Sequence, residues 1–275
     1  MAPGCYDALG ATLIEQAGFD ACYMTGFGSA ASLLGQPDIG LLSGPEMTDN
    51  ARRIAAATRL PVIADADTGY GNPLNVMRTV REYERAGVAA LQLEDQVAPK
   101  RCGHMEDKAV VPAGEMVQKI RAAVEARHDQ DLVIVGRTDA RAVEGLPAAI
   151  ERAHAYAEAG ADLLFIEAPR SIGELQQIAA AGLPRPLVYN LVDGGKTPIL
   201  SASEIAELGF ALLLVPIATL LHATAAMRQA LHTLRHDGLP APVPALEGDG
   251  DDPFAAFTDL IGLPEALELQ RRFGN

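Results

Sequence analysis

Short apolar runs alternate with longer amphipathic segments along most of the chain. Most of the apolar runs are continuous, which is typical of strands that are covered on both faces. The segments between them have helical periodicity and often end at a glycine, as at Gly18, Gly87 and Gly160. We predict eight strands, at Met1–Pro3, Ala21–Thr25, Val62–Asp65, Ala90–Leu93, Leu132–Gly136, Leu163–Ile166, Leu187–Tyr189 and Ala211–Val215.

Eight strands with intervening helices predict an α/β fold, a (β/α)8 barrel of the TIM type, over residues 1–236. A doubly wound open sheet fits less well, because eight units is many for such a sheet. Residues 237–275 begin with a linker rich in Pro, Gly and Asp and return to helical periodicity from Pro253 to Phe273. We expect the apolar side chains of this last helix to be buried on the chain's own barrel or on a neighbouring subunit.

Polar residues collect where the predicted strands end. In a barrel, the carboxyl ends of the strands form the rim that carries the active site. A helix cap or a turn explains one such residue, but it does not explain the same pattern at five consecutive strands. The residues concerned are Tyr23, Thr25 and Gly26, then Asp65 and Asp67, then Glu94, Arg137, Glu167 and Asn190.

Asp65 and Asp67 alternate with Ala66, so both can point into the barrel mouth. With Glu94 one strand away, three carboxylates could converge, and their repulsion would raise their pKa values. A divalent cation removes this cost, and Mg²⁺ suits a few carboxylates with water and substrate oxygens. Mn²⁺ is the alternative ion, and a zinc site lacks the usual His–Cys spacing. Arg137 offers a planar fork for a substrate carboxylate.

The segment Lys100–His104, with the sequence Lys-Arg-Cys-Gly-His, places the thiol of Cys102 among three basic residues. Cations lower the pKa of a thiol, so we expect Cys102 to exchange protons near working pH. The alternative is a surface cysteine beside a solvated run of charges. Gly103 suggests a loop that closes over substrate.

Composition narrows the function classes. The net charge of −14 disfavours nucleic acids and anionic membranes as partners, because both need cationic patches. Three cysteines do not form a disulfide framework and indicate a reducing compartment. No signal peptide is visible, and the longest apolar run, Ala211–Leu221, is too short to cross a bilayer. We therefore expect a cytoplasmic protein.

Several motifs together resemble the isocitrate lyase / phosphoenolpyruvate mutase superfamily, closest to its dimethylmalate lyase, petal death protein and methylisocitrate lyase branches. They are "YMTGFG", "GQPDIG", "DADTGYG", "EDQ…KRCGH", "GRTDARA", "FIEAP" and "NLVDGGKTP", in the family's order from Pro3 to about Arg228. The resemblance implies a (β/α)8 barrel whose last helix is exchanged between subunits of a homotetramer, a dimer of dimers. It also implies that a helix usually precedes the first strand, so we expect the natural start to lie upstream of Met1.

The resemblance also implies roles for individual residues. Mg²⁺ would lie near Asp65 and Asp67, with Asp38 and Glu94 contacting it through water. Tyr23, Thr25, Gly26, Arg137 and Asn190 would hold the 2-oxo or 2-hydroxy acid end of a di- or tricarboxylate, with Glu167 supporting them. Cys102 would protonate the carbanion left by C–C cleavage, and Lys100, His104 and Tyr23 would complete the catalytic group.

The branch within the superfamily is narrowed by two segments. Phosphonate-forming mutases generally lack the cysteine pentapeptide, which disfavours a phosphomutase. Enzymes that cleave 2-methylisocitrate usually carry an Arg near the position of Leu221 here, and "GGKTP" is more similar to dimethylmalate lyases. We therefore predict retro-aldol cleavage of a 2-alkylmalate to a 2-oxo acid such as pyruvate. The alternatives are a 2-methylisocitrate lyase, an oxaloacetate hydrolase or decarboxylase, and a non-catalytic barrel that only binds.

Overall fold

The computed structural model describes residues 1–240 and 252–274. The chain forms two compact units, Met1–Leu220 and Leu221–Asn275, and each is described by itself. Most of the predicted linker, residues 241–251, lies outside the described residues.

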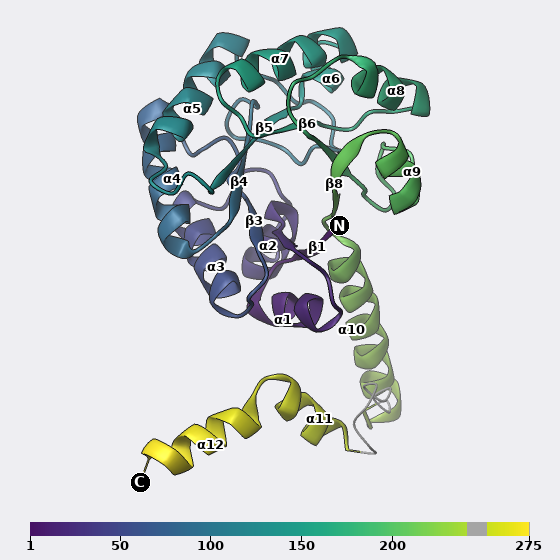
Figure 1. Cartoon of the computed structure of the whole chain (residues 1–275). Helices are drawn as coiled ribbons and strands as arrows, with labels where there is room; N and C mark the ends of the chain where they lie inside the picture. Colours follow the sequence, from purple (N-terminus) through teal and green to yellow (C-terminus); the bar gives the residue numbers. More distant parts are fainter. Residues whose placement is uncertain (241–251, 275) are drawn as a thin grey trace. The chain divides into compact units, whose positions relative to one another are not determined.

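The first unit is a closed barrel of eight parallel strands in sequential order (Figure 1). The ring closes where β1 pairs with β8, with Ala2 opposite Leu214 and Pro3 opposite Val215. The predicted (β/α)8 barrel is therefore confirmed, with strand ends displaced by one or two residues. The strands are β1 (Ala2–Cys5), β2 (Cys22–Met24), β3 (Val62–Asp65), β4 (Ala90–Glu94), β5 (Val133–Thr138), β6 (Leu163–Ile166), β7 (Leu187–Asn190) and β8 (Phe210–Val215).

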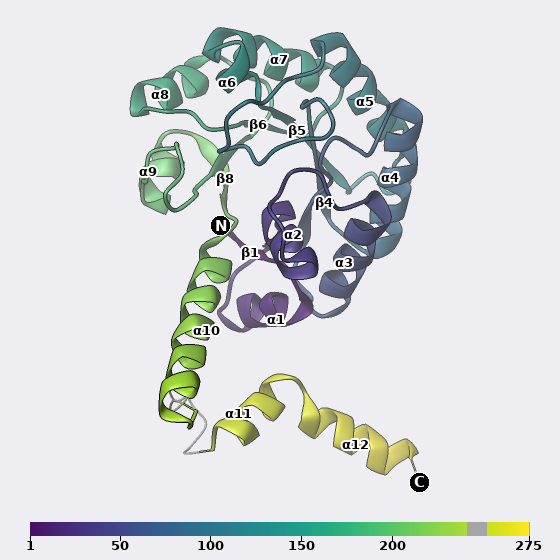
Figure 2. The same ribbon diagram turned by 180° about the vertical axis from the view of Figure 1, so that it is seen from behind.

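Helices surround the ring, and their ends follow from local chemistry. In α4, for example, the Asn72 side chain accepts hydrogen bonds from the N–H groups of Leu74 and Asn75, and Gly87 ends the helix at a φ of 89°. Figure 2 shows α2 lying across one end of the ring. The helices are α1 (Ala8–Gln16), α2 (Gly26–Leu34), α3 (Gly44–Ala56), α4 (Pro73–Ala86), α5 (Ala113–Ala126), α6 (Ala140–Val143), α7 (Leu146–Glu158), α8 (Ile172–Ala180), α9 (Ala202–Glu207) and the start of α10 (Ala218–Asp237).

Alternating side chains of the strands supply two separate apolar layers. Outward-facing residues, such as Leu91 and Ile134, pack against the helices in the larger cluster. Inward-facing residues fill the interior of the ring, and Ile63, Val135 and Phe165 belong to this smaller cluster. Both layers are needed because each strand is covered on both faces, which is why the strands read as continuous apolar runs.

The second unit contains most of α10, α11 (Pro253–Leu260) and α12 (Leu263–Phe273). The helical periodicity of its end is confirmed, but the predicted single helix is interrupted at Gly262, whose φ of 81° an α-helix does not accommodate. Phe254 and Phe273 are 77% and 73% exposed, so the second unit by itself does not bury them. No helix in the described part of the chain is long and apolar enough to cross a membrane.

Candidate active site

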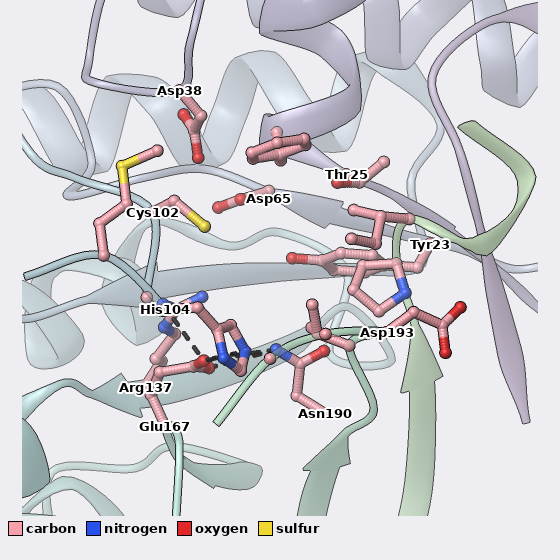
Figure 3. A pocket seen from close by; sticks show the side chains of 18 of the residues that line it. Tyr23, Thr25, Asp38, Asp65, Cys102, His104, Arg137, Glu167, Asn190 and Asp193 are labelled. Carbon is pink, nitrogen blue, oxygen red and sulfur yellow. Dashed lines mark hydrogen bonds and ion pairs between the residues drawn. The ribbon is translucent and has the colours of Figure 1, made fainter. Parts of the chain in front are cut away.

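A cavity of about 210 Å³ opens at the carboxyl ends of the barrel strands (Figure 3). Its wall includes most of the predicted site residues, namely Tyr23, Thr25, Asp38, Asp65, Lys100, Cys102, His104, Arg137, Glu167 and Asn190. The other three lie directly behind this wall. Asp67 pairs with Lys100, Glu94 pairs with Arg137, and Gly26 lies so close to Asp65 that a Cβ there would be 2.5 Å from its Oδ2.

Strand periodicity explains why these side chains meet. Ile63, Val135 and Phe165 face the interior of the ring, and the residue two positions further along each strand faces the same way. Those next residues are Asp65, Arg137 and Glu167, and they emerge at the carboxyl end of the barrel. Each strand is therefore apolar in the middle and polar at the rim.

Lys100 is at the centre of the acidic half of the site. Its buried Nζ lies 2.6 Å from Asp38 Oδ1 and 2.8 Å from Asp67 Oδ1. Burial disfavours the charged form of Lys100, but Asp67, Asp65 and Asp38 outweigh this effect and raise its pKa well above the usual range. Lys100 is therefore a fixed cation and not a base at neutral pH.

The predicted convergence of Asp65, Asp67 and Glu94 into one ligand cluster is not found. Within residues 1–240 and 252–274, no three His, Cys, Asp or Glu side chains are grouped so that they could hold a metal ion directly. Lys100 accounts for part of this, because its ammonium lies between Asp38 and Asp67. An ion in this half would take few direct protein ligands, the arrangement that Mg²⁺ commonly adopts with water and substrate oxygens.

Two buried carboxylates nevertheless fit a cation. Glu94 Oε1 has no hydrogen-bond donor, and Asp67 Oδ1 lies near Lys100 without a well-directed hydrogen bond. Burial raises the pKa of Asp67 to about 6, although Lys100 offsets part of the effect. Burial also raises the pKa of Glu94 well above its usual range, with Arg137 acting in the opposite direction. A divalent cation would relieve this destabilised charge.

Arg137 is at the centre of the other half of the site. Its Nε lies 3.0 Å from Asp139 Oδ2 and 3.2 Å from Glu94 Oε2, and its Nη2 lies 3.6 Å from Glu167 Oε2. Burial opposes ionisation of Glu167, but Arg137 and His104 outweigh it and lower its pKa to about 2. The Asn190 amide donates to Glu167 at 3.3 Å. Arg137 is thus held rigidly at the edge of the cavity.

His104 joins two loops over this half of the cavity. Its Nδ1 accepts a hydrogen bond from the Lys196 N–H at 3.0 Å, so the proton of a neutral ring is on Nε2, 3.0 Å from Glu167 Oε1. Gly195 packs directly on the ring, and a Cβ there would lie 2.8 Å from it. The loop after β7 therefore closes onto the loop after β4.

The expected pKa of Cys102 is corrected by the structure. Burial raises it to about 11, and nearby cations do not reverse this effect. Lys100 is occupied by Asp38 and Asp67, while Arg101 is half-exposed and pairs with Asp107. The thiol is therefore protonated at neutral pH, which is the form that a proton donor requires. Tyr23 is also protonated, because burial and then Asp65 raise its pKa well above the usual range.

Three buried charged residues near the site, Asp95, Lys108 and Asp139, were not assigned to it from the sequence. Asp139 pairs with both Arg137 and Lys108, and Asp95 accepts hydrogen bonds from Thr138 Oγ1 and the Asp139 N–H. Asp95 directly follows Glu94, and Asp139 is two positions after Arg137, which is a weak signal. Lys108 lies in a polar loop, and nothing in that segment distinguishes it from a solvated lysine.

A closed parallel barrel with acids, an arginine and a partly buried thiol at its carboxyl rim is typical of an enzyme that acts on a small molecule. The chain belongs to the phosphoenolpyruvate mutase / isocitrate lyase superfamily. The family model described as phosphoenolpyruvate phosphomutase matches residues 1–235. The predicted family and the predicted class of enzyme, a carbon–carbon lyase, are confirmed.

Among curated relatives, a 2,3-dimethylmalate lyase from Eubacterium barkeri is 48% identical over 99% of this chain and 93% of its own. A 2-methylisocitrate lyase from Shewanella oneidensis is 43% identical over 86% of this chain and 80% of its own. The similarity to the first thus extends through the C-terminal region, whereas the similarity to the second covers a smaller share of the chain.

Solved structures agree with this assignment. A crystal structure of 2,3-dimethylmalate lyase superposes with a TM-score of 0.92 at 42% identity, over 100% of this chain and 90% of that one. An oxaloacetate acetylhydrolase in complex with 3,3-difluorooxalacetate gives 0.92 at 41% identity, over 100% and 92%. A phosphonopyruvate hydrolase in complex with oxalate and Mg²⁺ gives 0.86 at 31% identity, over 100% and 94%.

Proposed function

We propose that the chain is a magnesium-dependent lyase that cleaves 2,3-dimethylmalate, or a closely related 2-alkylmalate, to a 2-oxo acid and a carboxylate. The observation that carries this proposal is the protonated thiol of Cys102 in the same small cavity as Arg137. Cleavage of a C–C bond leaves an electron pair on carbon, and a nearby neutral acid can protonate it. The full-length similarity to a 2,3-dimethylmalate lyase supports the choice of substrate.

The reaction balances with groups of this site. The hydroxyl of 2,3-dimethylmalate releases its proton to solvent, the C2–C3 bond breaks, and C2 becomes the ketone carbon of pyruvate. The electron pair left on C3 takes the Cys102 proton, which gives propionate, and the thiolate regains a proton from solvent. Arg137 would hold the carboxylate next to C2, and Tyr23 would donate a hydrogen bond to a substrate oxygen.

A divalent cation, Mg²⁺ or alternatively Mn²⁺, would be held near Asp65 and Asp67, with Glu94 and Asp38 as further acceptors. When bound, such an ion supplies a lower pKa for the substrate hydroxyl and stabilises negative charge. The unsatisfied oxygen of Glu94 and the raised pKa of Asp67 support this placement. The Mg²⁺ complex of the related phosphonopyruvate hydrolase also supports it.

Oxaloacetate hydrolysis is the second candidate, because oxaloacetate acetylhydrolase superposes as well as 2,3-dimethylmalate lyase does. Cleavage of 2-methylisocitrate is less favoured. The residues after β8 that line the cavity are Pro216 and Ile217, which offer no charge to a third carboxylate.

A substrate panel tests the proposal. The protein with Mg²⁺ is incubated with 2,3-dimethylmalate, 2-methylmalate, 2-methylisocitrate and oxaloacetate, and products are followed by proton NMR. We expect pyruvate and propionate from 2,3-dimethylmalate, and no turnover after metal removal with excess EDTA. Turnover of oxaloacetate alone would favour oxaloacetate hydrolysis. Full activity in excess EDTA would contradict the proposed dependence on a divalent cation.

A further inference from the structure

The loop between β4 and α5, residues 95–112, carries Cys102 and has a rigid base. At that base, Val97 N–H donates to Ala109 O and Val111 N–H donates to Asp95 O, both at 2.8 Å. The two strands of the loop are therefore paired like a short antiparallel ladder. Lys108 directly precedes this ladder, so its backbone position is fixed.

The Lys108 side chain is turned inward and is only 2% exposed. Its Nζ donates to the carbonyl oxygen of Gly103 and lies 2.6 Å from Asp139 Oδ1. An ammonium is buried at a large cost unless it is paired and hydrogen-bonded, and Lys108 has both kinds of partner. One cation thus connects the residue after Cys102 to a carboxylate of the barrel rim.

Asp139 is itself part of the site. Its Oδ2 accepts from Arg137 Nε at 3.0 Å, and its N–H donates to Asp95 Oδ1 at 2.8 Å. The carboxylate that receives Lys108 therefore also orients the arginine of the cavity. Because Asp139 keeps Arg137 as a partner, removal of the Lys108 ammonium does not leave an unpaired buried acid.

The Cys102–His104 segment, which Lys108 contacts through Gly103, packs tightly against the rim of the barrel. A Cβ on Gly103 would lie 2.4 Å from Arg137 Nη2 and 2.6 Å from Glu167 Oε1, so the backbone of Gly103 packs directly on that ion pair. On the other side of Cys102, the Gln96 amide makes two hydrogen bonds to the backbone of Arg101, at 2.7 and 2.9 Å. Cys102 thus lies between two attachments, one at Gln96 and one at Lys108, and its own N–H donates to Asp38 O at 3.1 Å.

We propose that Lys108 is a positioning residue, which holds the Cys102–His104 segment closed over the cavity through Gly103 and couples this closure to Arg137 through Asp139. Its effect on turnover rests on the proposed lyase function, but its effect on the loop does not. Loss of the Lys108 ammonium frees the Gly103 carbonyl. The contacts of His104 and the Cys102 N–H remain, but the segment is held less firmly and opens more often. The Cys102 thiol then becomes more accessible to solvent than in the closed loop and is no longer aimed at substrate.

Alkylation of Cys102 measures closure independently of turnover. Intact protein is treated with iodoacetamide, and the labelled peptide is quantified by mass spectrometry, with the buried Cys5 and Cys22 as internal references. We expect Lys108→Met to raise the labelling rate of Cys102 at least about tenfold, because thiol reactivity follows exposure. Lys108→Arg, which keeps a cationic donor, should restore most of the protection.

Arg101→Met is the matched control, because it removes a half-exposed cation from the same loop and should label at the wild-type rate. With an active substrate, Lys108→Met should lower kcat at least about tenfold, the scale of a misplaced proton donor, and Lys108→Arg should recover it. If Lys108→Met does not fold, the labelling rate of Cys102 is measured in Lys108→Gln instead, with the same expected increase.

Equal labelling of wild type and a folded Lys108→Met variant would overturn the proposal. Faster labelling supports it even if no malate derivative is cleaved, in which case only the proposed function fails. Faster labelling of the Arg101→Met control to the same extent would also overturn it, because any loss of a loop cation would then suffice.

Discussion

The thiol of Cys102 is partly buried at the cavity wall, and this burial is the main cause of its raised pKa. Replacement by serine keeps the size and the loop contacts but provides a much weaker acid. We expect Cys102→Ser to lower kcat for 2,3-dimethylmalate by at least about a hundredfold, the low end of general acid catalysis. KM should change little, because Arg137 and the proposed metal site would do most of the binding. A variant with near wild-type kcat would show that another group protonates the carbon.

The same residue predicts a pH dependence. A proton donor works only while it is protonated, and burial raises the Cys102 pKa to about 11. Activity limited by this thiol should therefore persist through pH 9 and fall only as the pH approaches 11. A kcat profile measured up to the pH at which the protein unfolds tests this. Loss of activity with a midpoint well below 9 would mean that the thiol is more acidic than its burial predicts.

At the residue scale, the positions of the site residues were easier to predict from the sequence than the pKa of Cys102. Polar residues at the strand ends were recognisable, because Asp65, Arg137 and Glu167 each follow a continuous apolar run. The direction of the Cys102 pKa was wrong, since adjacency in sequence does not show which way Lys100 and Arg101 point. Lys108 was missed because its partner, Asp139, is remote in sequence and its burial depends on the closed loop.

At the scale of elements, the loop after β4 depends on the absence of a side chain at Gly103. We expect Gly103→Ala to lower kcat/KM at least about tenfold, because its methyl group would push the loop off Arg137 and Glu167. Gly114→Ala is the matched control. Gly114 lies in α5, and a Cβ there meets no atom within 4 Å. It should keep full activity and leave the melting temperature unchanged or slightly higher. Equal activity of both variants would contradict the tight fit.

Element types were more predictable than element ends. Thr25 was assigned to a strand, but its side chain accepts from the Gly28 N–H and starts α2. β-branched residues favour strands on average, and only the tertiary structure shows that this one caps a helix. The interruption at Gly262 was missed for a similar reason, because the apolar periodicity continues on both sides of it.

At the scale of the whole molecule, the C-terminal helices carry apolar side chains that their own unit leaves exposed. Phe254, Phe257 and Phe273 are 77%, 43% and 73% exposed. Such exposure favours burial against another subunit, and we expect a homotetramer by light scattering at micromolar concentration. Phe254→Asp should lower the measured mass without changing the barrel. A monomeric mass for the wild type would refute the assembly.

The ring of eight strands also determines when the site can exist. The wall of the cavity includes residues from Tyr23, near the start of the chain, to Ile217, just after β8. The ring of strands closes only when Ala2 pairs with Leu214. Contacts between such distant residues form late, because a long stretch of chain must first be ordered. During synthesis on a ribosome, the first seven strands can thus be complete while the chain still lacks a substrate pocket. Catalytic competence would be acquired in a single late step and not strand by strand.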